Sequence, residues 1–243
     1  MVRPGRRVPS GPPATLNELA MMELARRAGL EVPETRWVHR DQLEGVPDAV
    51  WPEAEFHAYA VRRFDREEGG GRVHMEDFAQ VRGWYPRAKY DGTYEPLANL
   101  VYRRHDASSL RRMVRQLAFC VLTRNGDAHL KNWSLLYRDP RRPQLSPAYD
   151  LVCTQPYRDD GSTEDLALKL GGSKDFDRVR LSTFGDLQRR LGVGGTPFVD
   201  EVADVADRVE RAWPEVREVM DYSPLAPRIG SILQDSLSRF RRH

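Results

Sequence analysis

Cysteines and long apolar stretches are scarce in this sequence of 243 residues. The two cysteines, Cys120 and Cys153, lie far apart and have neither a CxxC spacing nor a histidine partner, so neither a disulfide framework nor a zinc site is indicated. No apolar run approaches the ~20 residues that cross a bilayer, and the N-terminus lacks the apolar core of a secretory signal. We therefore expect a soluble, cytoplasmic protein that makes no membrane contact.

An excess of charge of either sign is also missing, because 38 basic residues face 36 acidic ones and the formal net charge is +2. Such a balance creates no long-range field that would attract nucleic acid, so no direct nucleic-acid binding is expected. Lysine is rare as well. Only four of the basic residues are lysines, and none precedes Lys89. This scarcity matters because phosphoryl transfer usually depends on a particular lysine.

The N-terminal part of the chain combines a loop-like segment with a clear helix. Residues 1–15 are rich in proline, glycine and arginine and predict a flexible leader in which no strand can form. A helix is expected from about Asn17 to Ala28, with Gly29 as its C-cap and Pro33 just beyond it.

A strand and a turn are expected next. The alternating residues 57–64 predict a strand, and Gly69, Gly70 and Gly71 predict a plain turn after it. These glycines do not form a phosphate-binding loop, because they follow two glutamates, lack the GxxxxGK pattern and have no lysine nearby.

The remaining chain shows mainly helical periodicity. A long buried helix is expected over Asp106–Arg124 and another over Pro197–Trp213, interrupted at Pro214, and a last helix follows the apolar residues from Ile229 to Phe240. Together with the strand region before residue 75, this pattern predicts an α+β protein that is mostly helical.

The polar residues most suggestive of chemistry gather between these elements. Asp127 lies in a loop at the end of the buried helix, Asn132 follows five residues later, and Asp150 comes after an intervening hairpin. In metal-assisted phosphoryl transfer one carboxylate orients the attacking hydroxyl, while an amide and a second carboxylate supply oxygen ligands to magnesium. The spacing allows all three side chains to converge, and kinase catalytic loops also place an Asn five residues after the catalytic Asp.

Several ordered segments resemble one bacterial family. TRNGDAHLKNWSLLY followed by LSPAYDL resembles the signature of the HipA-type toxin kinases, which have a kinase-like two-lobed fold. NELAMMELARRAGLEVPE, AYAVRRFDR and HMEDFAQVRG resemble other segments of that family in the same order, so the resemblance runs from about Leu16 to the C-terminus. It implies a protein-kinase-like C-terminal lobe over residues 76–243 and a truncated N-terminal lobe over residues 16–75.

The resemblance also implies roles for the catalytic segment. Asp127 would be the catalytic carboxylate, and Asn132 and Asp150 would be the ligands of Mg²⁺. His129 and Lys131 would lie along the phosphates of ATP.

A second group of residues would hold the adenine end of the nucleotide. By the same resemblance, Arg62, Arg63 and Phe64 form the hinge that contacts adenine through its backbone. Tyr149, next to Asp150, joins the nucleotide-binding residues.

The sequence departs from the family at its front. The family pattern has a Gly-rich loop and a strand lysine before the first helix, and Glu18 would normally hold that lysine or its surroundings. Neither feature is recognisable here, so we expect weak activity of the isolated chain unless a separately encoded N-lobe subunit completes the site.

Three functions were weighed. The first is an ATP- and magnesium-dependent kinase that phosphorylates a Ser or Thr of a protein substrate, as the toxin of a toxin-antitoxin system with a HipB-like antitoxin. The alternative is an inactive remnant that binds an antitoxin repressor. A metal-dependent hydrolase is disfavoured because the sequence lacks a histidine-rich or closely clustered carboxylate ligand set. The sequence indicates neither the protein substrate nor the oligomeric state.

Overall fold

A computed structural model of the chain describes residues 2–3, 14–47, 49, 51, 56–158, 161–220 and 223–241. Its α-helices are α1 (Ala14–Arg27), α2 (Phe78–Val81), α3 (Tyr94–Tyr102), α4 (Ala107–Leu122), α5 (Leu181–Leu191), α6 (Phe198–Glu218) and α7 (Leu225–Phe240). Its strands are β1 (Val2–Arg3), β2 (Thr35–His39), β3 (His57–Val61), β4 (His74–Asp77), β5 (Ser134–Tyr137), β6 (Gln144–Leu145), β7 (Asp165–Leu170) and β8 (Ser173–Asp175). The fold is mixed α+β and about half helical, so the expected mixture is confirmed while the expected helical share was too high.

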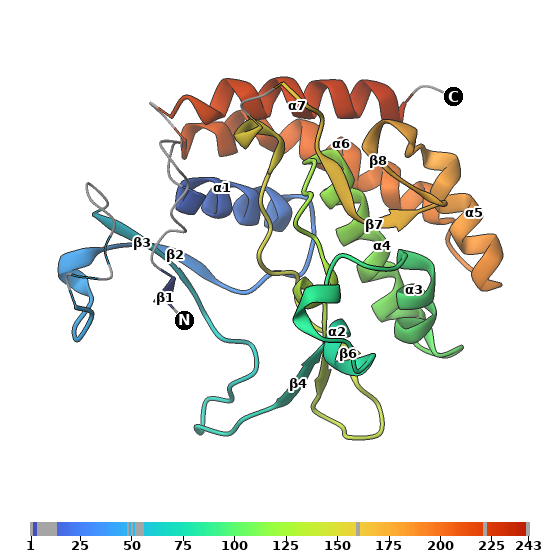
Figure 1. Ribbon diagram of the computed structural model, residues 1–243, viewed down its shortest axis with the longest axis horizontal. Helices are drawn as coiled ribbons and strands as arrows, with labels where there is room; N and C mark the ends of the chain where they lie inside the picture. The colour runs from blue at the N-terminus through green and yellow to red at the C-terminus, as the bar shows by residue number, and fades with distance from the viewer. Residues whose placement is uncertain are drawn as a thin grey trace.

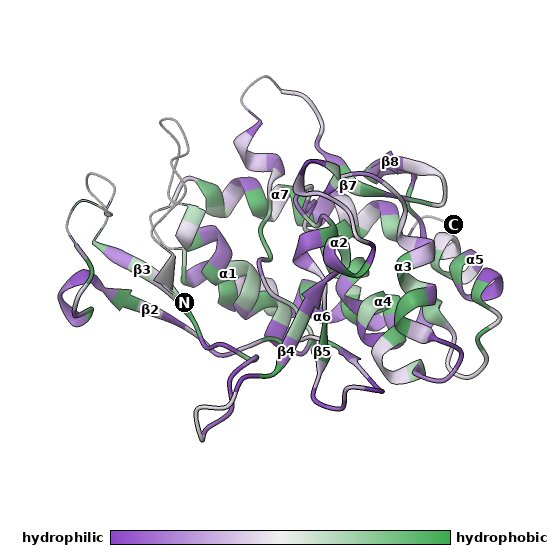
Figure 2. Cartoon of the chain, turned by 60° about the horizontal axis from the view of Figure 1, so that its bottom comes forward, coloured by the Kyte–Doolittle hydropathy of each residue, from purple (hydrophilic) through white to green (hydrophobic). Residues whose placement is uncertain are grey.

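The helices form the centre of the molecule. Figure 1 shows α6 and α7 running side by side across one side, and α6 also packs against α1, α4 and α5. The side chains of α4 are buried on nearly every face, among them Leu110, Met113, Leu117 and Val121. Figure 2 shows helices that are hydrophobic along part of their surface and hydrophilic along the rest, as expected for elements that share one core.

Within the described residues, three small antiparallel sheets surround this helical centre (Figure 1). The first has the order β1-β3-β2, and its register pairs Thr35 with Val61 and His39 with His57. The second, β4-β5-β6, joins the segment before α2 to the hairpin that follows Asn132. The third is the hairpin of β7 and β8.

The ends of α1 and α4 follow local rules. Gly29 has a φ of 79°, and the N–H groups of Gly29 and Leu30 donate to the carbonyls of Arg26 and Ala25 at 3.1 and 3.0 Å. This is a Schellman cap, so the predicted role of Gly29 is confirmed, although the helix begins at Ala14 rather than at about Asn17. The carboxylate of Asp106 caps α4 by accepting from the Ser109 N–H at 2.9 Å.

The predicted strand and turn are also present. β3 covers His57–Val61, and the Gly70 N–H donates to the Glu67 carbonyl at 3.0 Å in the turn that follows. The cysteines, Cys120 and Cys153, are buried free thiols, and burial raises the pKa of Cys120 to about 12. No helix within the described ranges is long and apolar enough to cross a membrane.

Two expectations about individual segments were wrong. Val2 and Arg3 form a strand that pairs with Ala60 and Tyr59, although no strand was expected in residues 1–15. Backbone groups at the edge of β3 accept a neighbouring strand whatever its side chains, which explains why composition did not reveal it. Residues 4–13 of the predicted leader lie outside the described residues.

The second wrong expectation concerns Pro214, which lies inside α6 instead of ending it. Proline removes one backbone hydrogen bond from a helix. The turn beyond it nevertheless buries Val216 completely, and Met220 just after the helix is also fully buried. We attribute the continuation to this apolar burial, which offsets the missing bond.

One buried side chain connects α1 to the segment that follows Asp150. Asn17 is fully buried, its Nδ2 donates to the Cys153 carbonyl at 2.8 Å, and its Oδ1 accepts from the Cys153 N–H at 3.0 Å. The same Nδ2 also donates to the Tyr157 hydroxyl at 3.2 Å. Asn17 therefore satisfies both backbone groups of a residue that is 136 positions away.

Replacing Asn17 with Ala should lower the free energy of unfolding by about 2–4 kcal/mol, because it leaves the buried N–H and C=O of Cys153 without partners. Urea unfolding followed by circular dichroism measures this loss. Arg26→Ala on the same helix, where the side chain is exposed in a surface ion pair, is the control and should change stability by less than about 1 kcal/mol. Equal effects of the two variants would contradict the role given to Asn17.

Candidate functional site

The Asp127 loop, residues 124–132, begins where α4 ends. Arg124 adopts a left-handed φ of 47°, and the N–H of buried Asn125 donates to the Cys120 carbonyl at 2.9 Å. The Asn125 Oδ1 then accepts from the Asp127 N–H at 3.0 Å, which forms a tight turn two residues long. The buried helix therefore delivers Asp127 to a loop whose backbone is held in one conformation.

Gly126 allows another segment to approach this loop closely. A Cβ at this position would lie 2.6 Å from the Glu164 carboxyl group and 2.8 Å from the Asp165 carbonyl oxygen. The Gly126 N–H donates to the Thr154 hydroxyl at 2.8 Å. A side chain here would push away the beginning of β7, so glycine is required by the packing.

Asn132 closes the loop from its other end. Its Nδ2 donates to the Asp127 carbonyl at 2.7 Å, and its own N–H donates to the His129 carbonyl at 2.9 Å. With the amide nitrogen occupied, Oδ1 is the atom of Asn132 that could bind a cation. The loop carbonyl between them, that of Ala128, accepts from Trp133 Nε1 at 3.1 Å and from the Tyr94 hydroxyl at 3.0 Å.

Asp150 is held by the residue before it. Asp150 has a φ of 59°, a left-handed conformation that Asp tolerates better than most residues. The Tyr149 hydroxyl lies 2.6 Å from Ser134 Oγ and donates to the Lys131 carbonyl at 3.0 Å. Tyr149 therefore links the segment of Asp150 to the Asp127 loop.

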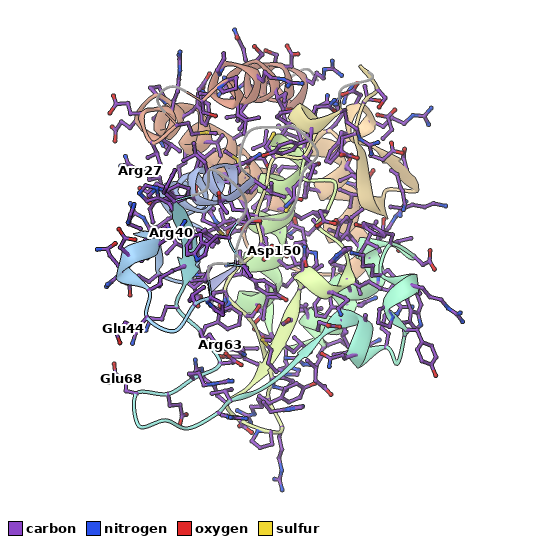
Figure 3. All side chains as sticks on the ribbon, turned by 60° about the vertical axis from the view of Figure 1, so that its left-hand side comes forward. Arg27, Arg40, Glu44, Arg63, Glu68 and Asp150 are labelled. Carbon is purple, nitrogen blue, oxygen red and sulfur yellow. The ribbon has the colours of Figure 1, made fainter. Side chains whose placement is uncertain are left out.

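Two cavities meet at Asp150. The Asp127 cavity has a volume of about 510 Å³, and its walls include Asp127, Asp150, Glu18, Glu164, Asp165 and Lys174. The Phe64 cavity has a volume of about 130 Å³, and its walls include Tyr59, Val61, Phe64, Met75 and Tyr149 with Arg62 and Arg63. Glu18 and Asp150 line both cavities. In Figure 3 Asp150 lies near the centre of the molecule, whereas Glu44 and Glu68 project at its edge.

The predicted hinge residues are arranged by ion pairs. Arg63 donates to both carboxylate oxygens of Asp65 at 2.7 and 2.5 Å, and Arg66 donates to Asp65 at 2.6 Å. These contacts, with that of Arg63 the strongest, lower the pKa of Asp65. The Arg62 N–H donates to the Glu34 carbonyl at 2.9 Å. It therefore cannot donate to an adenine in this structure.

His129 is buried within the Asp127 loop and lines neither cavity. Burial lowers the pKa of His129, and the charge of Lys89 lowers it further, while the charges of Asp127 and Asp150 oppose the shift. Its Nε2 lies 3.7 Å from Asp127 Oδ1, and its Nδ1 has no hydrogen-bond partner among the described atoms. We therefore expect a neutral imidazole at pH 7.

The predicted residues are thus distributed unequally. Asp127 and Asp150 share one cavity, and Arg62, Arg63, Phe64, Tyr149 and Asp150 share the other. His129, Lys131 and Asn132 do not line either cavity, although Asn132 is hydrogen-bonded to Asp127. Within the described part of the chain, no three His, Cys, Asp or Glu side chains gather closely enough to hold a metal ion by themselves.

Sequence reasoning missed Tyr90 and Lys174. The Tyr90 hydroxyl donates to Asp127 Oδ1 at 2.5 Å, and Lys174 Nζ donates to the Tyr90 carbonyl at 3.0 Å. The Lys89 ammonium lies 4.8 Å from the centre of the Tyr90 ring. The rarity of lysine was the one signal in the sequence, because two of the four lysines meet at this tyrosine.

Two proteins of known structure have a similar fold, and one of them is named a kinase. Shewanella oneidensis HipA, solved in complex with HipB and operator DNA, has a TM-score of 0.73 and 23% sequence identity over 95% of this chain and 56% of HipA. The Helicobacter pylori proinflammatory kinase CtkA has a TM-score of 0.58 and 14% identity over 93% of this chain and 84% of its own.

Sequence relatives define the family more narrowly. Residues 8–213 match the HipA-like C-terminal domain, and the chain belongs to this family, as its motifs indicated. A Sinorhizobium fredii protein named "Putative kinase Y4dM" is 36% identical over 89% of this chain and 52% of its own length. The serine/threonine-protein kinase toxin HipA of Shewanella oneidensis is 26% identical over 83% of this chain and 48% of its own. The chain therefore spans about half the length of these relatives.

Asp127→Asn should lower the pKa of His129 further, because the neutral amide no longer stabilises the imidazolium while burial still disfavours it. An NMR titration of the imidazole signals of the six histidines measures the change. Asp207→Asn on the exposed face of α6 is the control and should leave the His129 pKa unchanged. A rise in the His129 pKa in Asp127→Asn would contradict the geometry described here.

Proposed function

We propose that this chain is the catalytic part of an ATP- and magnesium-dependent kinase that phosphorylates a Ser or Thr hydroxyl of a protein. The observation that carries the proposal is that Asp127 and Asp150 line one cavity while Asn132 is hydrogen-bonded to the backbone of Asp127. A kinase needs this trio of oxygen-bearing side chains in one place. Family membership supports the same reaction class.

The Phe64 cavity suits an adenine base. Tyr59, Val61, Met75 and Tyr149 give it apolar and aromatic walls, which favour a planar ring over a phosphate. Because the Arg62 N–H is occupied within the sheet, we expect the hinge contact to come from the backbone of Arg63 or Phe64. Because Glu18 and Asp150 line both cavities, the phosphates of a nucleotide whose base occupies the Phe64 cavity would lie in the Asp127 cavity.

The donor set suits Mg²⁺, which prefers hard oxygen ligands and usually takes several of them from phosphate groups and water molecules. The Asp150 carboxylate and Asn132 Oδ1 would be the protein ligands of the ion. When bound, Mg²⁺ would neutralise charge on the β- and γ-phosphates. His129, neutral and buried, would support the loop without adding positive charge.

Asp127 would accept the proton of the attacking hydroxyl. Its Oδ1 accepts a hydrogen bond from the Tyr90 hydroxyl in this structure. A substrate hydroxyl that donates to Oδ1 therefore has to displace Tyr90. The exposed position of Tyr90, 38% accessible to solvent, makes such a displacement feasible. Lys131 is exposed and does not line the Asp127 cavity. We propose that its side chain contacts the phosphates from the solvent side of the cavity.

The proposed organisation follows the lobes of a kinase. We propose that residues 16–75, with α1 and the sheet of β2 and β3, are a truncated N-terminal lobe above the Phe64 cavity, and that residues 76–243 are the C-terminal catalytic lobe. The chain spans about half of its relatives. A separately encoded N-lobe subunit is a candidate partner in this proposal.

A toxin role and an antitoxin partner are proposed on narrower grounds. One relative is named a kinase toxin, and a structural neighbour was solved with HipB. A HipB-like antitoxin is thus the candidate partner for either an active kinase or an inactive remnant. The two are separated by nucleotide binding, which only the kinase requires.

Calorimetry with ATP in the presence and absence of Mg²⁺ tests the kinase directly. We expect magnesium-dependent binding that weakens at least about tenfold in Asp150→Ala, because the variant lacks a charged metal ligand. Asp127→Asn should retain binding and lose phosphoryl transfer. Asp207→Ala, a carboxylate on the exposed face of α6, is the matched control.

Two results would argue against this function. One is a folded wild-type chain that binds no nucleotide even with an added N-lobe subunit. The other is Asp150→Ala binding magnesium and ATP as tightly as the wild type. Either result would favour the remnant that binds an antitoxin.

A further inference from the structure

Lys174 on β8 is a positively charged residue on the wall of the Asp127 cavity, and its hydrogen-bond partner among the described residues is a neutral group. Its ammonium donates to the Tyr90 carbonyl at 3.0 Å. Arg158, another cation on the same wall, donates instead to the Glu164 carboxylate at 2.7 and 3.3 Å. The charge of Arg158 is thus balanced by a neighbouring carboxylate, whereas the hydrogen bond of Lys174 to a described residue goes to a neutral carbonyl.

The cavity walls are otherwise rich in carboxylates, among them Glu18, Asp127, Asp150 and Asp165. A polyphosphate placed among these groups would be repelled unless cations compensate, because like charges at short range disfavour one another in a partly buried site. A metal ion at Asp150 would compensate on one side. A second cation is needed near Asp127, where the transferred phosphoryl group would meet the attacking hydroxyl.

The other lysines are less well placed for this task. Lys131 and Lys169 are exposed and do not line the cavity, and Lys89 lies over the Tyr90 ring. Lys174 is the lysine that shares a cavity with both Asp127 and Asp150.

The hairpin that carries Lys174 is anchored to the helical centre. The Lys169 N–H on β7 donates to the Gly92 carbonyl at 3.2 Å, and the Gly171 N–H at the turn donates to Glu95 of α3 at 2.9 Å. An ammonium has three N–H donors, so Lys174 can keep its bond to Tyr90 and still donate to a ligand. The backbone of the hairpin is therefore held in place, while the ammonium of Lys174 can still donate to a ligand.

We propose that Lys174 binds the γ-phosphate of ATP and neutralises its charge during transfer, an assignment that rests on the kinase function proposed above. In this step the substrate oxygen forms a bond to the γ-phosphorus, the bond from that phosphorus to the β,γ-bridging oxygen breaks, and ADP leaves. Asp127 accepts the hydroxyl proton. Lys174 remains protonated throughout and acts only through its charge and its hydrogen bonds.

Calorimetric comparison of MgATP with MgADP tests the assignment in the full chain. In Lys174→Met we expect MgATP binding to weaken about tenfold or more and MgADP binding to change less than about twofold, because only ATP carries the γ-phosphate. Lys174→Arg keeps the charge and should restore most of the preference for ATP. Lys169→Met, an exposed lysine on the adjacent strand, is the matched control and should behave as the wild type.

A second readout uses the small number of lysines. Amine acetylation mapped by mass spectrometry should show Lys174 protected by the non-hydrolysable β,γ-imido analogue of ATP with Mg²⁺, but not by MgADP. Lys169 should react equally in both. Thermal melting of each variant shows whether it is folded.

The possible results separate the two proposals. If the wild type binds both nucleotides and Lys174→Met weakens them equally or not at all, the role of Lys174 is wrong while the nucleotide site stands. If Lys174 reacts equally with ATP analogue and ADP present, the assignment fails in the same way. If the wild-type chain binds neither nucleotide, with or without an N-lobe subunit, the proposed function fails and the role of Lys174 falls with it.

Discussion

The requirement that buried backbone groups be hydrogen-bonded organises the region where α4 ends. The helix stops inside the protein, so the amides and carbonyls of residues 124–128 need partners there. Asn125 supplies one through its side chain, and Asn132 supplies another through its bond to the Asp127 carbonyl. Thr154 serves two more, because its hydroxyl accepts from Gly126 and donates to the Arg124 carbonyl. The result is a rigid loop whose carboxylate, Asp127, faces a cavity.

Hydrogen bonds from single side chains also link distant parts of the chain to this loop. Asn17 holds the segment after Asp150 against α1, and Tyr149 holds the segment before it against the Asp127 loop. Asp150 therefore lies between two fixed points, which accounts for its left-handed backbone being maintained. Asp150 lines both cavities, so its position determines where the Asp127 cavity meets the Phe64 cavity.

Charge in the site is distributed in a way that the total net charge conceals. Many arginines form ion pairs at the surface, whereas Lys89 and Lys174 meet at Tyr90, which is hydrogen-bonded to Asp127. The pKa of His129 is lowered, mainly by burial. Positive charge near Asp127 thus comes from lysines and not from His129. The lysines are therefore the groups that could contact a ligand, whereas His129 supports the loop.

The sequence by itself determined the long helices, the Gly29 cap, the turn at Gly69–Gly71 and the loop of Asp127 and Asn132, because periodicity, caps and motif spacing are local properties. It also indicated the family. Only the tertiary structure decided the rest. Tyr90 reaches Asp127 from 37 residues away and Asn17 reaches Cys153 from 136, and no local pattern encodes such contacts. The pairing of β1 with β3 depends on an open strand edge, and the continuation of α6 beyond Pro214 depends on apolar burial. Both depend on neighbours in space, which the sequence alone does not reveal.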